Sequence, residues 1–177
     1  MKKVYSLVWA ALTLVMLAGW HSEARAQGSF ELITGTAFTK ALPEKFYLEG
    51  NAIPTEPRNA AMLKTPTAPR ALIALMDTTG YSSRIKQKYI GMIITEGKLS
   101  VCGISLGVGS YGFGLDRPAA PSDADAKFFV YNQAGEKLGE CSVKKDTALK
   151  QGSPLKVVVQ KGGGATLELT RYVLQLQ

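Results

Sequence analysis

From residue 30 to the C-terminus, the apolar residues of this chain fall into short runs that are interrupted by turn residues. The runs show almost no helical periodicity, whereas β-strands of about four to eight residues fit them well. Candidate strands cover residues 30–37, 46–48, 71–76, 89–95, 98–101, 103–115, 127–132, 137–143, 155–160 and 165–176. A count of about nine strands at short spacing predicts an all-β fold, either a single antiparallel β-sandwich or a small β-barrel.

Residues 51–70 interrupt this succession of strands. Their prolines are Pro54, Pro57, Pro66 and Pro69. Because proline lacks an amide hydrogen and has a fixed φ angle, we expect a loop or an edge covering here. One or two helical turns are an alternative for residues 57–64.

Three turns are predicted to close antiparallel hairpins. Glu96 and Gly97 would turn residues 89–95 back into residues 98–101. The segments 133–136 and 161–164 would do the same for the strands that flank them, since both contain glycine.

The N-terminus has the parts of a secretory signal. A basic start precedes a mostly apolar run over residues 4–20, and Ala24-Arg25-Ala26 is a small-x-small cleavage site. We therefore expect residues 1–26 to be a signal peptide and residues 27–177 to form a single exported β domain. That domain would be secreted or periplasmic, without a transmembrane anchor after cleavage. An uncleaved anchor is the alternative, although the run is barely long enough to cross a bilayer.

Cys102 and Cys141 are the only cysteines of the chain. In an oxidising compartment an even pair most simply forms one structural disulfide bond. A redox pair would favour closer spacing, such as Cys-x-x-Cys, and two free thiols are the remaining alternative. We expect the disulfide bond, which would join the strand after Lys98 to the hairpin strand that begins at Lys137.

Glycines alternate with apolar residues over residues 103–115, and the apolar parity reverses near Ser110. Since successive side chains of a strand face opposite sides, the reversal predicts either that the buried face changes along the strand or that a bulge or sharp bend near Ser110 restores the register. Residues 107–112 also match the dinucleotide fingerprint Gly-x-Gly-x-x-Gly, but that motif needs a helix that opens at its last glycine. Pro118 and Pro121 disfavour such a helix, so we expect no cofactor.

Arg84, Lys86 and Lys88 recur at every second position. In a strand they would place three positive charges on one face, which predicts a surface for an anionic envelope component. A solvated sheet face is the alternative. Tyr111 and Phe113 are candidates for a cavity that takes a small apolar ligand, although core packing explains most aromatic residues. Nucleic acid is not an expected partner, because the chain carries an export signal and no recognition motif. The sequence leaves the oligomeric state open.

Cleavage of the signal would remove His21, the only histidine. A chain without histidine has no Ser-His-Asp triad and no imidazole metal ligands. The loop acids Asp116, Asp123 and Asp125 lack the spacing of a calcium-binding loop, so we expect no metal site.

These exclusions favour a non-catalytic β domain of the cell envelope that binds a ligand or partner through a sheet face or a barrel mouth. One alternative is a small carboxylate-dependent hydrolase that acts on envelope polymers. Asp77, in the segment Asp-Thr-Thr-Gly, is the candidate acid for that reaction. Another alternative is a structural subunit of a surface assembly. No catalytic residue is assigned.

Overall fold

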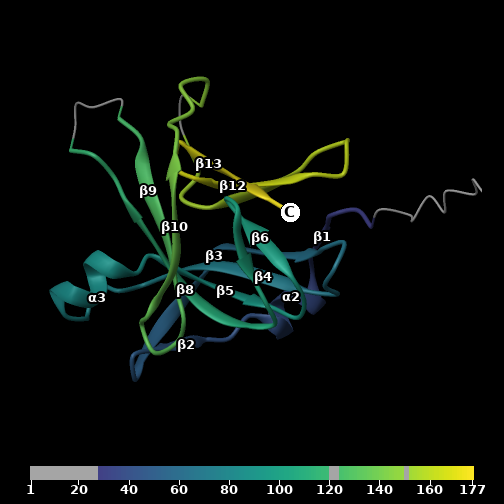
Figure 1. Ribbon diagram of the computed structural model, residues 1–177. Helices are drawn as coiled ribbons and strands as arrows, with labels where there is room; N and C mark the ends of the chain where they lie inside the picture. The colour runs from purple at the N-terminus through teal and green to yellow at the C-terminus, as the bar shows by residue number, and fades with distance from the viewer. Residues whose placement is uncertain (1–27, 120–123, 150–151) are drawn as a thin grey trace, which may run out of the picture.

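The computed structural model describes residues 28–119, 124–149 and 152–177 (Figure 1). The predicted signal peptide, residues 1–26, lies outside the described residues. Two antiparallel sheets contain the strands β1 to β13, so the all-β prediction is confirmed, and the architecture is the sandwich. The chain forms more strands than the sequence predicted, because two of the expected strands are each divided and one strand forms in the predicted loop.

The larger sheet has eight strands. Hydrogen bonds link seven of them in the order β1-β3-β4-β5-β8-β9-β10, and β2 pairs with β3 outside this path. Their bounds are β1 Glu31–Ile33, β2 Lys45–Leu48, β3 Asn51–Lys64, β4 Ala71–Met76, β5 Gly91–Thr95, β8 Gly109–Asp116, β9 Ala126–Tyr131 and β10 Lys137–Val143. The predicted hairpin around residues 133–136 is confirmed, since β9 and β10 pair antiparallel.

The smaller sheet has five strands in the order β11-β12-β13-β6-β7. Their bounds are β6 Leu99–Val101, β7 Ile104–Leu106, β11 Lys156–Val159, β12 Ala165–Leu169 and β13 Tyr172–Leu176. The predicted hairpin around residues 161–164 is confirmed for β11 and β12. Residues 165–176, expected as one strand, are two strands joined by a two-residue turn, because Leu169 pairs with Tyr172.

The main core lies between the two sheets. Ile73, Ile93 and Phe113 of the larger sheet belong to one buried cluster with Leu167 and Leu174 of the smaller sheet. All five side chains are at most 1% exposed. Burial of each such side chain contributes about 1.5–3 kcal/mol relative to an exposed one, so this interface is the main stabilising element of the sandwich.

A disulfide bond ties the two sheets together. The sulfur atoms of Cys102 and Cys141 lie 2.14 Å apart, and their Cα atoms lie 6.4 Å apart. Cys102 is in the two-residue turn between β6 and β7, and Cys141 is in β10. The predicted bridge between these two segments is therefore confirmed.

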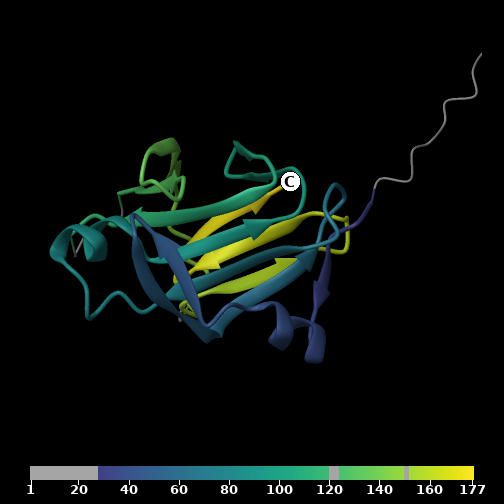
Figure 2. The same cartoon turned by 90° about the horizontal axis from the view of Figure 1, so that it is seen from below.

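A second buried cluster covers the outer face of the larger sheet, opposite the smaller sheet. Strand β2 and the helices α2 (Thr36–Ala41) and α3 (Ser83–Lys88) lie against this face. In Figure 1 the strands β12 and β13 of the smaller sheet lie above β3, β4 and β5 of the larger one, while β9 and β10 rise beside them. Strand β2 lies at the bottom of this view, and Figure 2 shows the molecule from below. Because β4 is buried on both faces, its sequence is a continuous apolar run.

The prediction of a loop over residues 51–70 is wrong for its first part, which forms the long strand β3. Pro54 lies where β3 pairs with β2, and Pro57 lies in an irregular stretch between Thr55 and Ala60 where the register with β4 shifts. The prolines thus avoid the continuous ladder between β3 and β4, which explains why a strand tolerates them. The helical alternative for residues 57–64 is also wrong.

The chain crosses between the sheets twice from β5 to β8. Strand β5 belongs to the larger sheet, β6 and β7 to the smaller one, and β8 to the larger one again. Residues 96–97 therefore do not close a hairpin, and residues 103–115 are not one bent strand. Both predictions are wrong. The apolar parity reverses near Ser110 because β7 and β8 bury opposite parities against the core from different sheets.

Two glycines of β8 permit a close approach of other chain segments to the outer face. A Cβ atom on Gly114 would lie 2.2 Å from the carbonyl oxygen of Lys88, and one on Gly112 would lie 2.8 Å from Cδ1 of Leu48. These glycines therefore allow packing of α3 and β2 on the sheet, rather than bending of the strand.

Candidate functional site

The cations Arg84, Lys86 and Lys88 lie on helix α3, so the prediction of a strand face is wrong. The hydroxyl of Ser82 caps this helix and accepts a hydrogen bond from the amide of Ile85 at 3.4 Å. Residues four positions apart share a helix face. Arg84 and Lys88 therefore lie on one face, while Lys86 is exposed on another.

The shared face of Arg84 and Lys88 meets Glu49, in the turn between β2 and β3. Nη2 of Arg84 lies 2.5 Å from Oε2 of Glu49, and Nζ of Lys88 lies 2.6 Å from Oε1. The hydroxyl of Tyr89 donates to the same Oε1 at 2.6 Å. Only 9% of the Glu49 side chain is exposed. We refer to Glu49, Arg84, Lys88 and Tyr89 as the Glu49 cluster.

The turn between β9 and β10 closes around the Lys88 ammonium group. Nζ of Lys88 donates to the carbonyl oxygen of Gly135 at 2.6 Å, and it lies 5.2 Å and 4.8 Å from the ring centroids of Tyr89 and Tyr131. Gly135 has a φ angle of 88°, and a Cβ atom there would lie 2.3 Å from Oε1 of Glu49. The Glu49 cluster thus joins the β2–β3 turn, helix α3 and the β9–β10 turn.

These contacts keep the charges of the cluster in place. The hydrogen bond from Lys88, followed by that from Tyr89, lowers the pKa of Glu49 below its ordinary value of 4.5. Burial, followed by the hydrogen bond to Glu49, raises the pKa of Tyr89 above its ordinary value of 10.0. The carboxylate is therefore ionised and satisfied by its own chain at neutral pH. It also neutralises part of the charge of Arg84 and Lys88, so binding of an anionic envelope component to α3 stays a prediction.

The aromatic candidates Tyr111 and Phe113 lie on the inward face of β8, away from α3. Phe113 is fully buried, and its ring centroid lies 5.5 Å from that of Phe128. Tyr111 is partly buried, and its hydroxyl donates to the carbonyl oxygen of Gly107 at 3.0 Å. The structure therefore uses Phe113 as a core residue and does not bring the two aromatic side chains together with the cations of α3.

Asp77 lies directly after β4 and is exposed. Its Oδ1 accepts hydrogen bonds from the hydroxyl of Thr79 at 2.6 Å and from the Thr79 amide at 3.0 Å, and both lower its pKa. Asp77 lines an open hollow of about 450 Å³ together with Glu56. An ionised Asp77 is suited to the role of a base, not to that of a proton donor.

Within residues 28–119, 124–149 and 152–177, no group of three or more histidine, cysteine, aspartate or glutamate side chains could hold a metal ion.

An apolar row crosses the outer face of the larger sheet at the end where α2 lies. The strand register places Ile33 opposite Met62, Met62 opposite Leu72, Leu72 opposite Ile94, and Ile94 opposite Ser110. We refer to these five residues as the outer row. The four apolar members span three strand spacings, or about 14 Å. The row was missed in the sequence because each member comes from a different strand, and alternation within one strand does not show which strands become neighbours.

The outer face becomes charged two residues beyond the outer row, at one end of each of the strands β1, β3, β4 and β5. Glu31 lies opposite Lys64 across β1 and β3, and Nη2 of Arg70 lies 2.5 Å from Oε1 of Glu96. The side chains of Arg70 and Glu96 are 55% and 36% exposed. We refer to Glu31, Lys64, Arg70 and Glu96 as the charged border. It separates the outer row from the end of the sheet.

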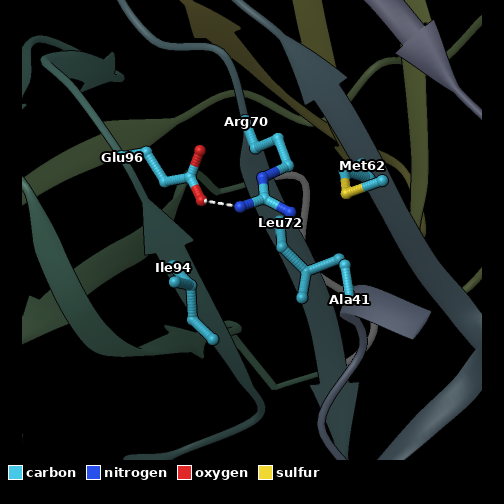
Figure 3. Close-up of a pocket in the computed structure, with 6 residues that line it drawn as sticks. All are labelled: Ala41, Met62, Arg70, Leu72, Ile94 and Glu96. Carbon is cyan, nitrogen blue, oxygen red and sulfur yellow. Dashed lines mark ion pairs between the residues drawn. The ribbon is translucent and has the colours of Figure 1, made fainter. Parts of the chain in front are cut away.

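Helix α2 lies against the outer row, whose central members Met62 and Leu72 are only 2% and 4% exposed, while Ile33 and Ile94 are half-buried. None of its six residues is fully buried, and no side chain caps its start at Gly35. A hollow of about 140 Å³ beside α2 is lined by Ala41, Met62, Arg70, Leu72, Ile94 and Glu96 (Figure 3). A second hollow of about 150 Å³ is lined by Leu32, Ile33, Thr34, Gly35, Phe38 and Ala60–Met62. Met62 lines both hollows, so they flank α2 along the outer row.

Figure 3 shows how the first hollow is built. Leu72 and Ile94 extend from the neighbouring strands β4 and β5, and Ala41 approaches from the end of α2. The Arg70–Glu96 ion pair lies at one end of these apolar side chains. The hollow therefore combines an apolar floor with charged groups at its rim, as small-molecule sites commonly do.

None of the helices in the described part of the chain is long and apolar enough to cross a bilayer. A comparison of the chain with protein-family models, with curated proteins and with solved structures finds no match.

Proposed function

We propose that this protein is an exported, non-catalytic binding domain of the cell envelope, and that it binds a small apolar ligand on the outer face of its larger sheet, beside α2. The observation that carries the proposal is the outer row. Its apolar side chains belong to one continuous face, on which Ile33 and Ile94 are partly exposed while a short and weakly anchored helix lies against the buried Met62 and Leu72. Partly covered apolar surface of this kind is typical of ligand grooves.

The carboxylate-dependent hydrolase has less support. Its candidate acid, Asp77, is exposed and has a lowered pKa, whereas the proton donor of a glycosidase needs a raised one. The well-buried carboxylate, Glu49, is held by three partners of its own chain. Neither group is free to donate a proton to a substrate at neutral pH.

A structural subunit that assembles by strand addition also has less support. Such a subunit needs a long and regular edge strand. Among the described strands, the sheet edges β1, β7 and β11 have three or four residues each. The longer edge strand β10 has an irregular register between Lys137 and Gly139 and carries the disulfide bond at Cys141.

A titration with decanol, followed through the backbone amide signals in NMR spectra, tests the proposal. We expect saturable shifts at Met62, Leu72 and Ile94. Ile94→Thr keeps a β-branched residue but shortens the apolar floor, so it should weaken binding several-fold. The matched control is Leu138→Thr, at a 48% exposed position of β10, which should leave binding unchanged. The absence of saturable shifts, or shifts on another face, would contradict the proposal.

A further inference from the structure

Lys64 ends β3 and Arg70 directly precedes the neighbouring strand β4, so two cations occupy the middle of the charged border. Leu63 of β3 pairs with Ala71 of β4, and the same register extended by one residue sets Lys64 opposite Arg70. Both side chains are on the outer face, because Met62 and Leu72, two residues away, are on that face. Like charges directly across a strand pair repel each other. An anion above this position would relieve the repulsion.

The acids of the charged border lie at its two ends. Glu31 is on the far side of Lys64, and Glu96 is on the far side of Arg70. The order along the border is therefore acid, base, base, acid. The positive pair lies beside Met62 and Leu72, the central members of the outer row. A ligand whose alkyl chain follows the outer row would bring its head group to this pair.

The Arg70–Glu96 pair shows that the guanidinium of Arg70 binds a carboxylate at this position. A carboxylate oxygen already lies 2.5 Å from Nη2 of Arg70, and the planar guanidinium fork matches carboxylate geometry. Because both side chains are substantially exposed, this ion pair contributes little to stability. A second carboxylate can therefore replace Glu96 on Arg70 at small cost.

We propose that the ligand is a medium-chain fatty acid, which displaces α2 from the buried Met62 and Leu72. Its alkyl chain lies along Ile33, Met62, Leu72 and Ile94, and its carboxylate lies on Arg70 and Lys64. This inference rests on the proposed function of the outer row. It adds the head group, its orientation toward the charged border, and a competing role for Glu96. The span of about 14 Å between the first and last apolar residues suits one extended alkyl chain of moderate length.

Calorimetric titrations of the mature protein with decanoate and with decanol test the inference. Wild-type protein should bind decanoate at least about tenfold more tightly than decanol, because a hydrogen bond to a charged group is stronger than one to a neutral group. Arg70→Gln should remove that preference, because it should weaken decanoate binding far more than decanol binding. Glu96→Gln frees Arg70 and should tighten decanoate binding by about three- to fivefold, within the strength of an exposed ion pair.

Lys127→Gln is the matched control for charge, since it removes an exposed cation on β9, away from the charged border. It should leave decanoate binding unchanged, whereas Lys64→Gln should weaken it. Equal affinities of wild-type protein for the two ligands, or an equal loss of both in Arg70→Gln, would overturn the fatty-acid assignment while the outer row remains a binding site. If neither ligand binds, the proposed function fails as well.

Analytical sedimentation of the unliganded protein measures whether it is a monomer or a dimer. A dimer that Ile94→Thr dissociates would mean that a second copy of the chain covers the outer row, and this would overturn the inference. A monomer that binds decanoate agrees with it.

Discussion

The carboxylate of Glu49 and the ammonium group of Lys88 lie 2.6 Å apart, although 39 residues separate them in the chain. Glu49 has a φ angle of 48°, in the left-handed region that non-glycine residues seldom adopt. With Gly50 it forms the two-residue turn between β2 and β3, where Leu48 pairs with Asn51. Turns of this type need positive φ angles. The hairpin conformation of Glu49 therefore directs its side chain toward α3.

Replacing Glu49 by glutamine should destabilise the protein by about 2 kcal/mol. The change leaves Lys88 partly buried without its counter-charge. The expected loss of stability lies between the costs of breaking an exposed ion pair and a fully buried one. Urea unfolding measures the effect. The control is Glu140→Gln, which breaks an exposed ion pair to Lys137 and should cost less than about 0.5 kcal/mol. Equal losses in the two variants would contradict a special role for Glu49.

The stability of the protein should fall in acid through Glu49. Its pKa in the folded state lies below 4.5, its ordinary value, so its contribution is fully present above pH 4.5 and is lost as the pH falls toward the folded-state pKa. Unfolding free energies measured between neutral pH and about pH 3 check this. Glu49→Gln should show a shallower decline over that range. A decline as steep as that of the wild type would show that other carboxylates cause it.

Replacing Gly114 by alanine should cost about 3 kcal/mol, because the new Cβ atom would lie 2.2 Å from the carbonyl oxygen of Lys88, a backbone atom that cannot move independently. Gly107 is the matched control in the same segment. Nothing lies within 4 Å of a Cβ atom there, so Gly107→Ala should be nearly neutral. Thermal or urea unfolding of both variants compares them. A larger loss in Gly107→Ala would refute the packing role of Gly114.

Loss of the Cys102–Cys141 bond should cost about 4 kcal/mol by the chain-entropy estimate for its loop. The sequence separation that closes the loop is 39 residues. The double variant Cys102→Ser/Cys141→Ser should unfold at lower urea concentration than the oxidised wild type and match the reduced wild type. Peptide mapping without reductant should find one linked peptide pair in protein isolated from the producing cell. Two free thiols in that protein would contradict the bond.

Export should remove residues 1–26 of the precursor. The basic start, the apolar run and Ala24-Arg25-Ala26 motivate this prediction, which concerns residues outside the described part of the chain. N-terminal sequencing or intact mass measurement of protein from the periplasm or medium should begin at Gln27. A product that retains the whole apolar run would indicate an anchor. Replacing Ala24 and Ala26 by leucine should block cleavage.

The fold class and much of the local structure follow from short stretches of the sequence. The short apolar runs over residues 127–132 and 165–176 predicted strands, and the glycine-containing turns predicted two hairpins that the structure has. These features depend on neighbours along the chain. Helix α3 also has a local signal, since Ser82 caps it and lysines occupy its last turn. The even spacing of its cations was read instead as a strand.

Long-range packing assigns each strand to its sheet and thereby forms the candidate site. The parity reversal near Ser110 is compatible with a bulge or with a change of sheet, and only the pairing of β7 with β6 and of β8 with β5 distinguishes them. The outer row likewise depends on the register of five strands, of which β1 and β8 do not follow directly on β3, β4 and β5 in the sequence. Strand order follows from how apolar faces pack across the whole molecule, and this information is absent from any single run of residues.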